Sequence, residues 1–236
     1  MTKLVQKIIN PMKALTLNID ASMNGVALVL MKGGKSVKAW YMTESKKPKF
    51  KAPNVIPVFL DGKLKKENQE RNYLHWKLIN TILGGHKPDY IAIEDYAMGS
   101  STHNAYSIGE MQYNYRLAAM IHGIPLRLYE PTKVKMFGTG NGSAQKSQMV
   151  VACITKWEKI NFANFGKSGE DLADAYIIGQ LLLTELKVQT GEIKLKDLPA
   201  KMQESFCKVS KHYPVPLKDR SFILPPKLGV IYDEDS

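Results

Sequence analysis

Cysteine is scarce in this chain of 236 residues, which contains two, Cys153 and Cys207. Two cysteines cannot form a disulfide framework or a four-cysteine zinc site. No apolar run reaches the roughly 18 residues that a membrane span requires. The N-terminal residues include lysines but no sustained apolar stretch before a cleavage site, so a secretory signal is not expected. These absences favour a protein with no membrane association in a reducing, cytoplasmic setting.

Acidic residues are outnumbered, with 22 Asp plus Glu against 33 Lys plus Arg, a formal net charge of +11. Hydrophobic residues make up 44% and charged residues 23%, which is ordinary globular composition. The excess is largest between Met31 and Arg71, where eleven basic residues face four acidic ones. A basic chain of this kind predicts a polyanionic partner. A solvated, lysine-rich surface is the alternative.

Five short apolar runs predict five β-strands: Ala14–Ile19, Gly25–Met31, Ser36–Met42, Asp89–Glu94 and Pro125–Tyr129. The first three are joined by short links and predict an antiparallel meander. The fourth is apolar on both faces, which is typical of a central strand that is covered on both sides.

Four helices are expected after the third strand. Helical spacing predicts them over Asn68–Leu83, Asn104–Ile121, Ser143 to about Trp157, and Glu170–Lys187. Gly84 and Gly85 are expected to end the first of these helices, and Ser143 is expected to be the N-cap of the third. The order of elements predicts an α/β fold with a mixed five-stranded sheet and helices on both faces.

Two segments depart from this pattern. Residues 44–66 are rich in Lys and Pro and are interpreted as a long surface loop or basic arm. After Gln189 several prolines predict an irregular C-terminal extension with one short helix around Ala200–Val209. The chain is therefore divided into one domain over residues 1–189, carrying the insertion, and an extension over residues 190–236.

Four acidic residues occupy notable positions. Asp20 ends the first predicted strand, Glu94 ends the fourth, and Asp171 and Asp174 lie three apart on one face of the last long helix. Singly, each has an ordinary explanation as a turn residue, a solvated strand end or a favourable charge at a helix N-terminus. If the first and fourth strands are neighbours and the last long helix crosses their ends, the four carboxylates gather and repel one another unless cations lie between them. Oxygen ligands of this kind select Mg²⁺ or Mn²⁺, and two such ions can hydrolyse a phosphodiester.

Four motifs resemble those of one family, in the same order. They are LNIDASMNGVALV around Asp20, DYIAIED around Glu94, PTKVKMFGTGNGSAQKSQMV, and EDLADAYIIG around Asp171 and Asp174. Together they resemble RuvC-type Holliday junction resolvases, which have a ribonuclease H-like fold. The match runs from about Ala14 to Leu186. The compact length and divergent extensions would suit a phage-encoded member.

The resemblance implies a Mg²⁺-dependent endonuclease that resolves four-way DNA junctions by paired nicks through a two-metal mechanism. The four carboxylates would hold two Mg²⁺ ions, for which Mn²⁺ can substitute. Lys146 would act in catalysis and in DNA binding, and Lys135 would contact phosphates. The resemblance also implies a homodimer, with Asn104–Ile121 as a dimer surface or, alternatively, as a helix that only packs on the sheet. The remaining DNA-contact candidates are Lys133, Tyr96 and Ser143.

The chain departs from the family at two positions near the site. Ala21 and Ser22 stand where the family has Pro-Gly, and Ala97 stands where many members carry an aromatic residue that stacks at the junction crossover. Stacking by Tyr96 could replace that aromatic residue. A basic arm that clamps DNA is one interpretation of residues 44–66, and a solvated insertion is the other.

Other functions are weighed against junction resolution. A nuclease acting more broadly on branched DNA or flaps shares the same chemistry. A non-catalytic junction-binding protein shares the fold but has no use for four clustered carboxylates facing DNA. An actin-like phosphotransferase would need a second half of the same fold, for which this chain is too short.

Overall fold

A six-stranded mixed sheet forms the centre of the computed structural model, in the order β4-β3-β2-β1-β5-β6. The structure describes residues 10–22, 25–43, 54–59, 68–95, 102–157 and 167–206. The strands are β1 (Leu15–Ser22), β2 (Gly25–Lys32), β3 (Lys35–Thr43), β4 (Val55–Phe59), β5 (Tyr90–Glu94) and β6 (Leu126–Tyr129). The first three form the expected antiparallel meander, and β5 and β6 follow in parallel beside β1. The prediction of a mixed α/β sheet is confirmed.

The sheet has one strand more than the five expected. β4 pairs in parallel with β3 at the edge of the sheet, within the segment interpreted as a loop or arm. Pro57 lies inside this strand, and proline is tolerated there because an edge strand leaves one row of backbone N–H groups unpaired. The proline content of residues 44–66 concealed a strand of five residues. The rest of that segment, residues 44–53 and 60–66, lies outside the described residues.

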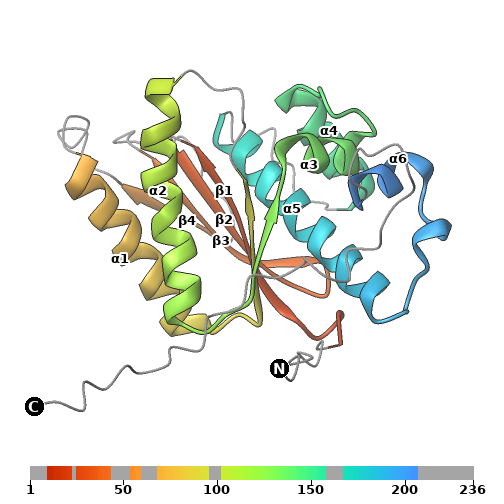
Figure 1. The fold of residues 1–236 in the computed structure, drawn as a ribbon, viewed down its shortest axis with the longest axis horizontal. Coiled ribbons are helices and arrows are strands. Elements are labelled where there is room, and N and C mark those ends of the chain that lie inside the picture. The colour runs from red at the N-terminus through yellow and green to blue at the C-terminus, as the bar shows by residue number, and fades with distance from the viewer. Residues whose placement is uncertain are drawn as a thin grey trace, which may run out of the picture.

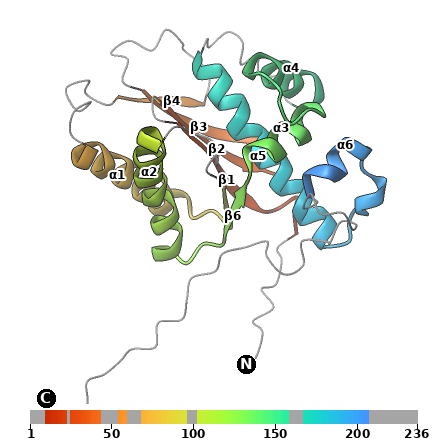
Figure 2. The ribbon, with the colours of Figure 1, turned by 45° about the horizontal axis from the view of Figure 1, so that its top comes forward.

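Helices cover both faces of the sheet (Figure 1). They are α1 (Asn68–His86), α2 (Thr102–Ile121), α3 (Pro131–Thr139), α4 (Lys146–Lys156), α5 (Lys167–Gln189) and α6 (Ala200–Gln203), with 3₁₀ turns at Leu195–Asp197 and Glu204–Phe206. α1 and α2 lie on one face, while α5 crosses the other face with α3 and α4 beside it (Figures 1 and 2). None of the helices in the described part of the chain has the length and apolarity that crossing a bilayer requires.

Three helical predictions need correction. α1 continues through Gly84 and Gly85 to His86, because a glycine inside a helix costs only about 1 kcal/mol. α3 was not expected, although Pro131 at its first turn is a recognised start signal. α4 starts at Lys146, and its N-cap is Gln145 rather than Ser143, since Gln145 and Gln148 form a reciprocal capping box.

Strand alternation divides the core into two layers. Ala27, Val29, Ala39 and Tyr41 face α5, α3 and α4, whereas their neighbours along the same strands face α1 and α2. β5 is buried over residues 90–93, which confirms its expected central place. The polar side chains that strand β1 turns toward α5 therefore lie inside the protein, next to that helix.

The first part of the C-terminal extension packs against α3. Phe206 is buried and contacts Phe137 edge to face, with ring centroids 6.1 Å apart. Lys133 Nζ donates a hydrogen bond of 2.9 Å to the backbone oxygen of Glu204. The short helix α6 lies where a helix was expected, while residues 207–236 are outside the described part. The division of the chain at residue 189 stays a prediction.

Candidate active site

Register and alternation place Asp20 and Glu94 beside each other. β1 and β5 are parallel neighbours, and their last registered pair is Ile19 with Ile93, so Asp20 and Glu94 each lie one residue further on. Ile19 and Ile93 point toward α1 and α2, hence the two acids point to the α5 side. Asp20 lies within β1 rather than at its end, because pairing with β2 continues to Ser22 and Gly25.

α5 adds the other two carboxylates. The helix begins at Lys167, three residues earlier than predicted, so Asp171 and Asp174 lie beyond its first turn. The helix N-terminus therefore explains their charge less well, because its effect is strongest within the first turn. Asp171 is 1% exposed and Asp174 8% exposed. Such burial of charged groups is costly unless they are paired or hold a cation.

Two donors hold Asp171. Lys146 Nζ, from the first residue of α4, forms an ion pair with Asp171 Oδ1 and lies 4.0 Å from Asp174 Oδ2. Tyr41 on β3 donates its hydroxyl proton to Asp171 Oδ2 over 2.9 Å. Asp174 Oδ1, in contrast, is buried without a hydrogen-bond partner. Sequence reasoning did not single out Tyr41, because an aromatic residue in a strand gives no local sign of a partner 130 residues away.

The four carboxylates affect one another electrostatically. Burial, followed by the negative charges of Glu94, Asp174 and Asp171, raises the pKa of Asp20 well above its usual value. Burial raises the pKa of Glu94 to about 7 and that of Asp174 to about 8, although the charges of Lys135 and Lys146 oppose both shifts. A cluster in which three acids have raised pKa values is typical of functional sites.

The same electrostatic interactions raise the pKa values of Lys146 and Tyr41. Burial lowers the pKa of Lys146, but the charges of Asp20 and Asp171 outweigh that effect and leave it raised. Burial and the charge of Asp171 raise the pKa of Tyr41. Both residues therefore keep their protons and remain donors at neutral pH.

These shifts predict that the metal-free protein loses stability as pH rises from about 6.5 to 8. Raised carboxyl pKa values mean that the folded protein binds more protons than the unfolded chain in this range, so the free energy of unfolding falls with pH. We expect a loss on the order of 2 kcal/mol, read as a lower melting temperature in the presence of a chelator. His75, whose pKa burial lowers to about 3, opposes the trend only below about pH 6.5.

The control for this experiment is Asp174→Asn, which removes one titrating carboxyl and should flatten the pH dependence. Mg²⁺ or Mn²⁺ added at pH 8 should restore the melting temperature of the unsubstituted protein more than that of the variant. A melting temperature that rises from pH 6.5 to 8 in chelator would contradict the electrostatic description of the site.

The other residues predicted to contact DNA differ in how they lie relative to the carboxylates. Lys135 on α3 lowers the pKa values of Glu94 and Asp174 by its charge, so its side chain lies within electrostatic reach of the cluster. Lys133, two residues away and hence on another side of the helix, donates to the backbone of Glu204. Ser143 is exposed in the loop before α4, and its backbone N–H donates to Asn141 Oδ1. Tyr96 lies outside the described residues.

The donor chemistry fits a divalent cation. Carboxylate oxygens are the ligands that Mg²⁺ and Mn²⁺ prefer, and Asp174 Oδ1 is a buried acceptor with no partner. As the side chains stand, no three of the described His, Cys, Asp or Glu residues are close enough to share one ion. Lys146 lies against Asp171 and supplies positive charge there, so holding an ion requires the carboxylates to draw together around it.

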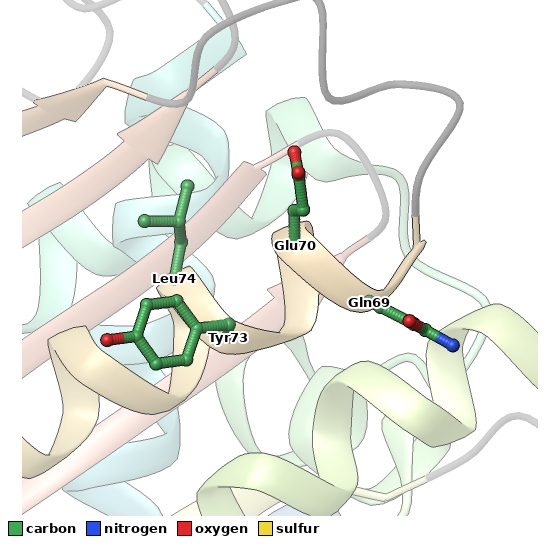
Figure 3. Close-up of a pocket in the computed structure, with 4 residues that line it drawn as sticks. All are labelled: Gln69, Glu70, Tyr73 and Leu74. Carbon is green, nitrogen blue, oxygen red and sulfur yellow. The ribbon is translucent and has the colours of Figure 1, made fainter.

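A separate hollow of about 490 Å³ lies on α1, lined by Gln69, Glu70, Tyr73 and Leu74 (Figure 3). All four residues come from the first two turns of α1, on the face of the sheet opposite α5. The hollow therefore does not belong to the carboxylate cluster.

The sheet order, with carboxylates carried side by side on the neighbouring strands β1 and β5, defines a ribonuclease H-like fold. Solved structures agree: the Thermus thermophilus RuvC in complex with Holliday junction substrate aligns with a TM-score of 0.51 at 18% identity, covering 75% of this chain and 96% of that one. The yeast mitochondrial Holliday junction resolvase Ydc2 aligns with a TM-score of 0.50 at 14% identity, over 80% and 84% of the two chains. At such identities these likenesses bear on the fold alone.

Sequence similarity assigns the chain to one family within this fold. The family model described as crossover junction endodeoxyribonuclease RuvC matches residues 61–178, half of the chain. Enzymes of that description from Bacteroides fragilis and Chromohalobacter salexigens are 30% and 34% identical over 106 and 113 residues, covering 44% and 48% of this chain and 56% of each relative. This chain belongs to the RuvC family.

Three of the four acids lie inside the family match. The family match contains Glu94, Lys135, Lys146, Asp171 and Asp174, whereas Asp20 precedes it. The aligned regions span about half the length of the two relatives named. A phage origin stays a prediction.

Proposed function

We propose that this protein is a Mg²⁺-dependent endonuclease that resolves four-way DNA junctions by paired nicks. The observation that carries the proposal is the convergence of Asp20, Glu94, Asp171 and Asp174 from three elements in a chain of the RuvC family. The formal net charge of +11 suits a DNA substrate.

The carboxylates would hold two divalent ions, with Mn²⁺ able to replace Mg²⁺. When bound, such ions lower the pKa of a water and neutralise charge on the scissile phosphate. Asp20 and Glu94 approach from the sheet and Asp171 and Asp174 from α5, so the four side chains are carried by packed elements rather than loops, and they would draw together when an ion binds. Lys146 is the residue best placed to meet negative charge that develops at the phosphate, since its ammonium group already lies among the acids.

DNA would approach over α3 and the start of α4. Lys135 supports this direction because its charge is felt by Glu94 and Asp174. Exposed Ser143 lies in the loop between the two helices, where its hydroxyl can meet a phosphate. Lys133 would contact DNA only after leaving the Glu204 carbonyl. Two further parts of the proposal rest on the sequence alone. Tyr96 would stack on bases at the crossover, and residues 44–66 would clamp the DNA.

Paired nicks require two active sites, and we propose a homodimer that uses α2. Tyr106 and Tyr113 are 77% and 58% exposed and lie seven residues apart, on one side of this helix. Large exposed aromatic side chains that share a helix face are typical of interfaces. Sedimentation of the full chain should give the mass of two copies at micromolar concentration, and a single-copy mass at all concentrations would contradict the dimer.

A panel of substrates tests the function. Wild-type protein in Mg²⁺ is expected to nick a synthetic four-way junction at least tenfold faster than a flap, a linear duplex or an RNA hairpin of matched length. The junction should also yield symmetrical nicks in opposed strands. Chelator should stop cleavage without abolishing binding.

Each other outcome of the panel favours a different function. Comparable rates on junction and flap would favour a broader branched-DNA nuclease. Tight binding of the junction with no nicking in Mg²⁺ or Mn²⁺ would favour a non-catalytic junction-binding protein and overturn the proposal.

A further inference from the structure

Tyr41 on β3 donates its hydroxyl proton to Asp171, one of the four acids, at the oxygen that Lys146 does not contact. Asp171 is held at both oxygens, Oδ1 by the Lys146 ammonium and Oδ2 by the Tyr41 hydroxyl. Its carboxyl group is therefore fixed in rotation as well as in position. Asp174, one turn further along α5, has no such restraint on Oδ1.

The local fold is adapted to admit the Tyr41 ring. Alternation along β3 turns Tyr41 toward α5, and the residue is 4% exposed. Its ring lies over Gly25 at the start of β2: a methyl group there would come within 2.9 Å of Tyr41 Cζ and still closer to its hydroxyl oxygen. Thus β2, β3 and α5 each contribute to one hydrogen bond: Gly25 gives space, Tyr41 the donor and Asp171 the acceptor.

The two donors on Asp171 differ in what they can do. Lys146 is 44% exposed along its side chain, sits at a helix start and belongs to the proposed phosphate contacts, so it is free to leave when ions and DNA arrive. Tyr41 lies on β3, which is paired on both sides by β2 and β4. It can keep its bond to Oδ2 while Oδ1 turns to another partner.

We propose that Tyr41 is a positioning residue that holds Asp171 Oδ2, so that Asp171 offers only Oδ1 to a divalent ion. The inference rests on the proposed function and deepens it. Single-oxygen ligation leaves room for the near-ideal octahedral geometry that Mg²⁺ demands. Loss of a hydrogen bond to a metal ligand commonly costs 10- to 100-fold in metal affinity or activity.

The variant that tests this role is Tyr41→Phe, which removes only the hydroxyl group. Its matched control is Tyr129→Phe, because Tyr129 also donates from a buried hydroxyl to a carboxylate of α5, Glu185, outside the cluster. Two quantities are measured for each protein: the affinity for Mn²⁺ without DNA, by titration calorimetry, and the Mg²⁺ concentration that gives half-maximal junction cleavage.

We expect Tyr41→Phe to weaken Mn²⁺ binding about tenfold and to raise the half-maximal Mg²⁺ concentration by a similar factor. Excess Mn²⁺, which tolerates less regular geometry, should recover most of the cleavage rate. Tyr129→Phe should lower the melting temperature but leave both ion-dependent quantities within twofold of wild type. Should Tyr41→Phe fail to fold, Gly25→Ala displaces the same hydroxyl and is expected to weaken Mn²⁺ binding likewise.

The outcomes separate the two proposals. If wild type binds Mn²⁺ and cleaves junctions while Tyr41→Phe matches Tyr129→Phe in both quantities, Tyr41 has no positioning role and the proposed function stands. If wild type neither binds Mn²⁺ nor cleaves, the proposed function fails, and the role of Tyr41 fails with it.

Discussion

Asp20→Asn is expected to abolish junction cleavage while leaving junction binding intact. Asp20 is buried between Glu94 and the two acids of α5, whose charges all raise its pKa. The amide keeps the size of the side chain but removes the negative charge that a divalent ion needs. A loss on the order of 1000-fold in the cleavage rate corresponds to about 4 kcal/mol of lost transition-state stabilisation. The rate is measured on a synthetic junction under single-turnover conditions, and binding by gel shift in Ca²⁺.

A matched control separates charge removal at the site from charge removal in the core. Glu185→Gln neutralises another buried carboxylate of α5, which pairs with Arg127 at 3.0 Å. It should lower the melting temperature, because it leaves the Arg127 charge without its partner, and it should retain cleavage. If Asp20→Asn cleaved as fast as wild type, the carboxylate cluster would not be the catalytic site.

Gly179→Ala is the second substitution for which a large effect is expected. α5 crosses β1 so closely at Gly179 that an added methyl group would lie 2.5 Å from Asn18 Nδ2 and nearer still to Met31 Sδ. Asn18 cannot easily yield, since its Nδ2 donates to Val29 O and Thr16 Oγ1 inside the sheet. The helix must therefore move outward, which we expect to cost about 1–3 kcal/mol.

The functional consequence comes from the position of the acids on the same helix. Moving α5 away from β1 carries Asp171 and Asp174 away from Asp20 and Glu94, and misplacement of about 1 Å can cost 100-fold in rate. We expect cleavage to fall by at least tenfold at a temperature where the variant is fully folded. Circular dichroism checks the folding and single-turnover kinetics give the rate.

The control is Gly84→Ala, in a helical stretch of α1 with no atom within 4 Å of the added methyl group. This substitution should stabilise the protein slightly, because alanine is the better helix former, and leave cleavage unchanged. Equal rates for Gly179→Ala and wild type would show that the α5–β1 spacing does not set the geometry of the site.

The sequence was most informative where local patterns report on geometry. The positions of Asp20 and Glu94 after two apolar runs predict that they lie side by side if the two strands are neighbours, and the parallel pairing of β1 with β5 meets that condition. The i, i+3 spacing of Asp171 and Asp174 likewise defined a shared helix face. Such inferences succeed because strand and helix periodicities fix side-chain direction.

Features that depend on tertiary contacts were missed. The prolines of residues 44–66 predict a loop over Val55–Phe59 despite its β-branched residues, and only an edge position beside β3 makes it a strand. The capping of α4 by Gln145 needs the side chain of Gln148, which a preference for Ser or Thr caps does not reveal. Tyr41 could be recognised only once α5 was placed over the sheet. The role of Tyr96 stays a prediction.

A crystal structure of the wild-type protein with a four-way junction and Ca²⁺ would show whether the four carboxylates hold metal ions against DNA, because Ca²⁺ occupies oxygen sites but supports this type of hydrolysis poorly. We expect two ions held by Asp20, Glu94, Asp171 and Asp174 against one phosphate of the junction, with Lys146 turned from Asp171 toward that phosphate. A junction bound elsewhere on the protein, or bound here with no ion among the four carboxylates, would contradict it.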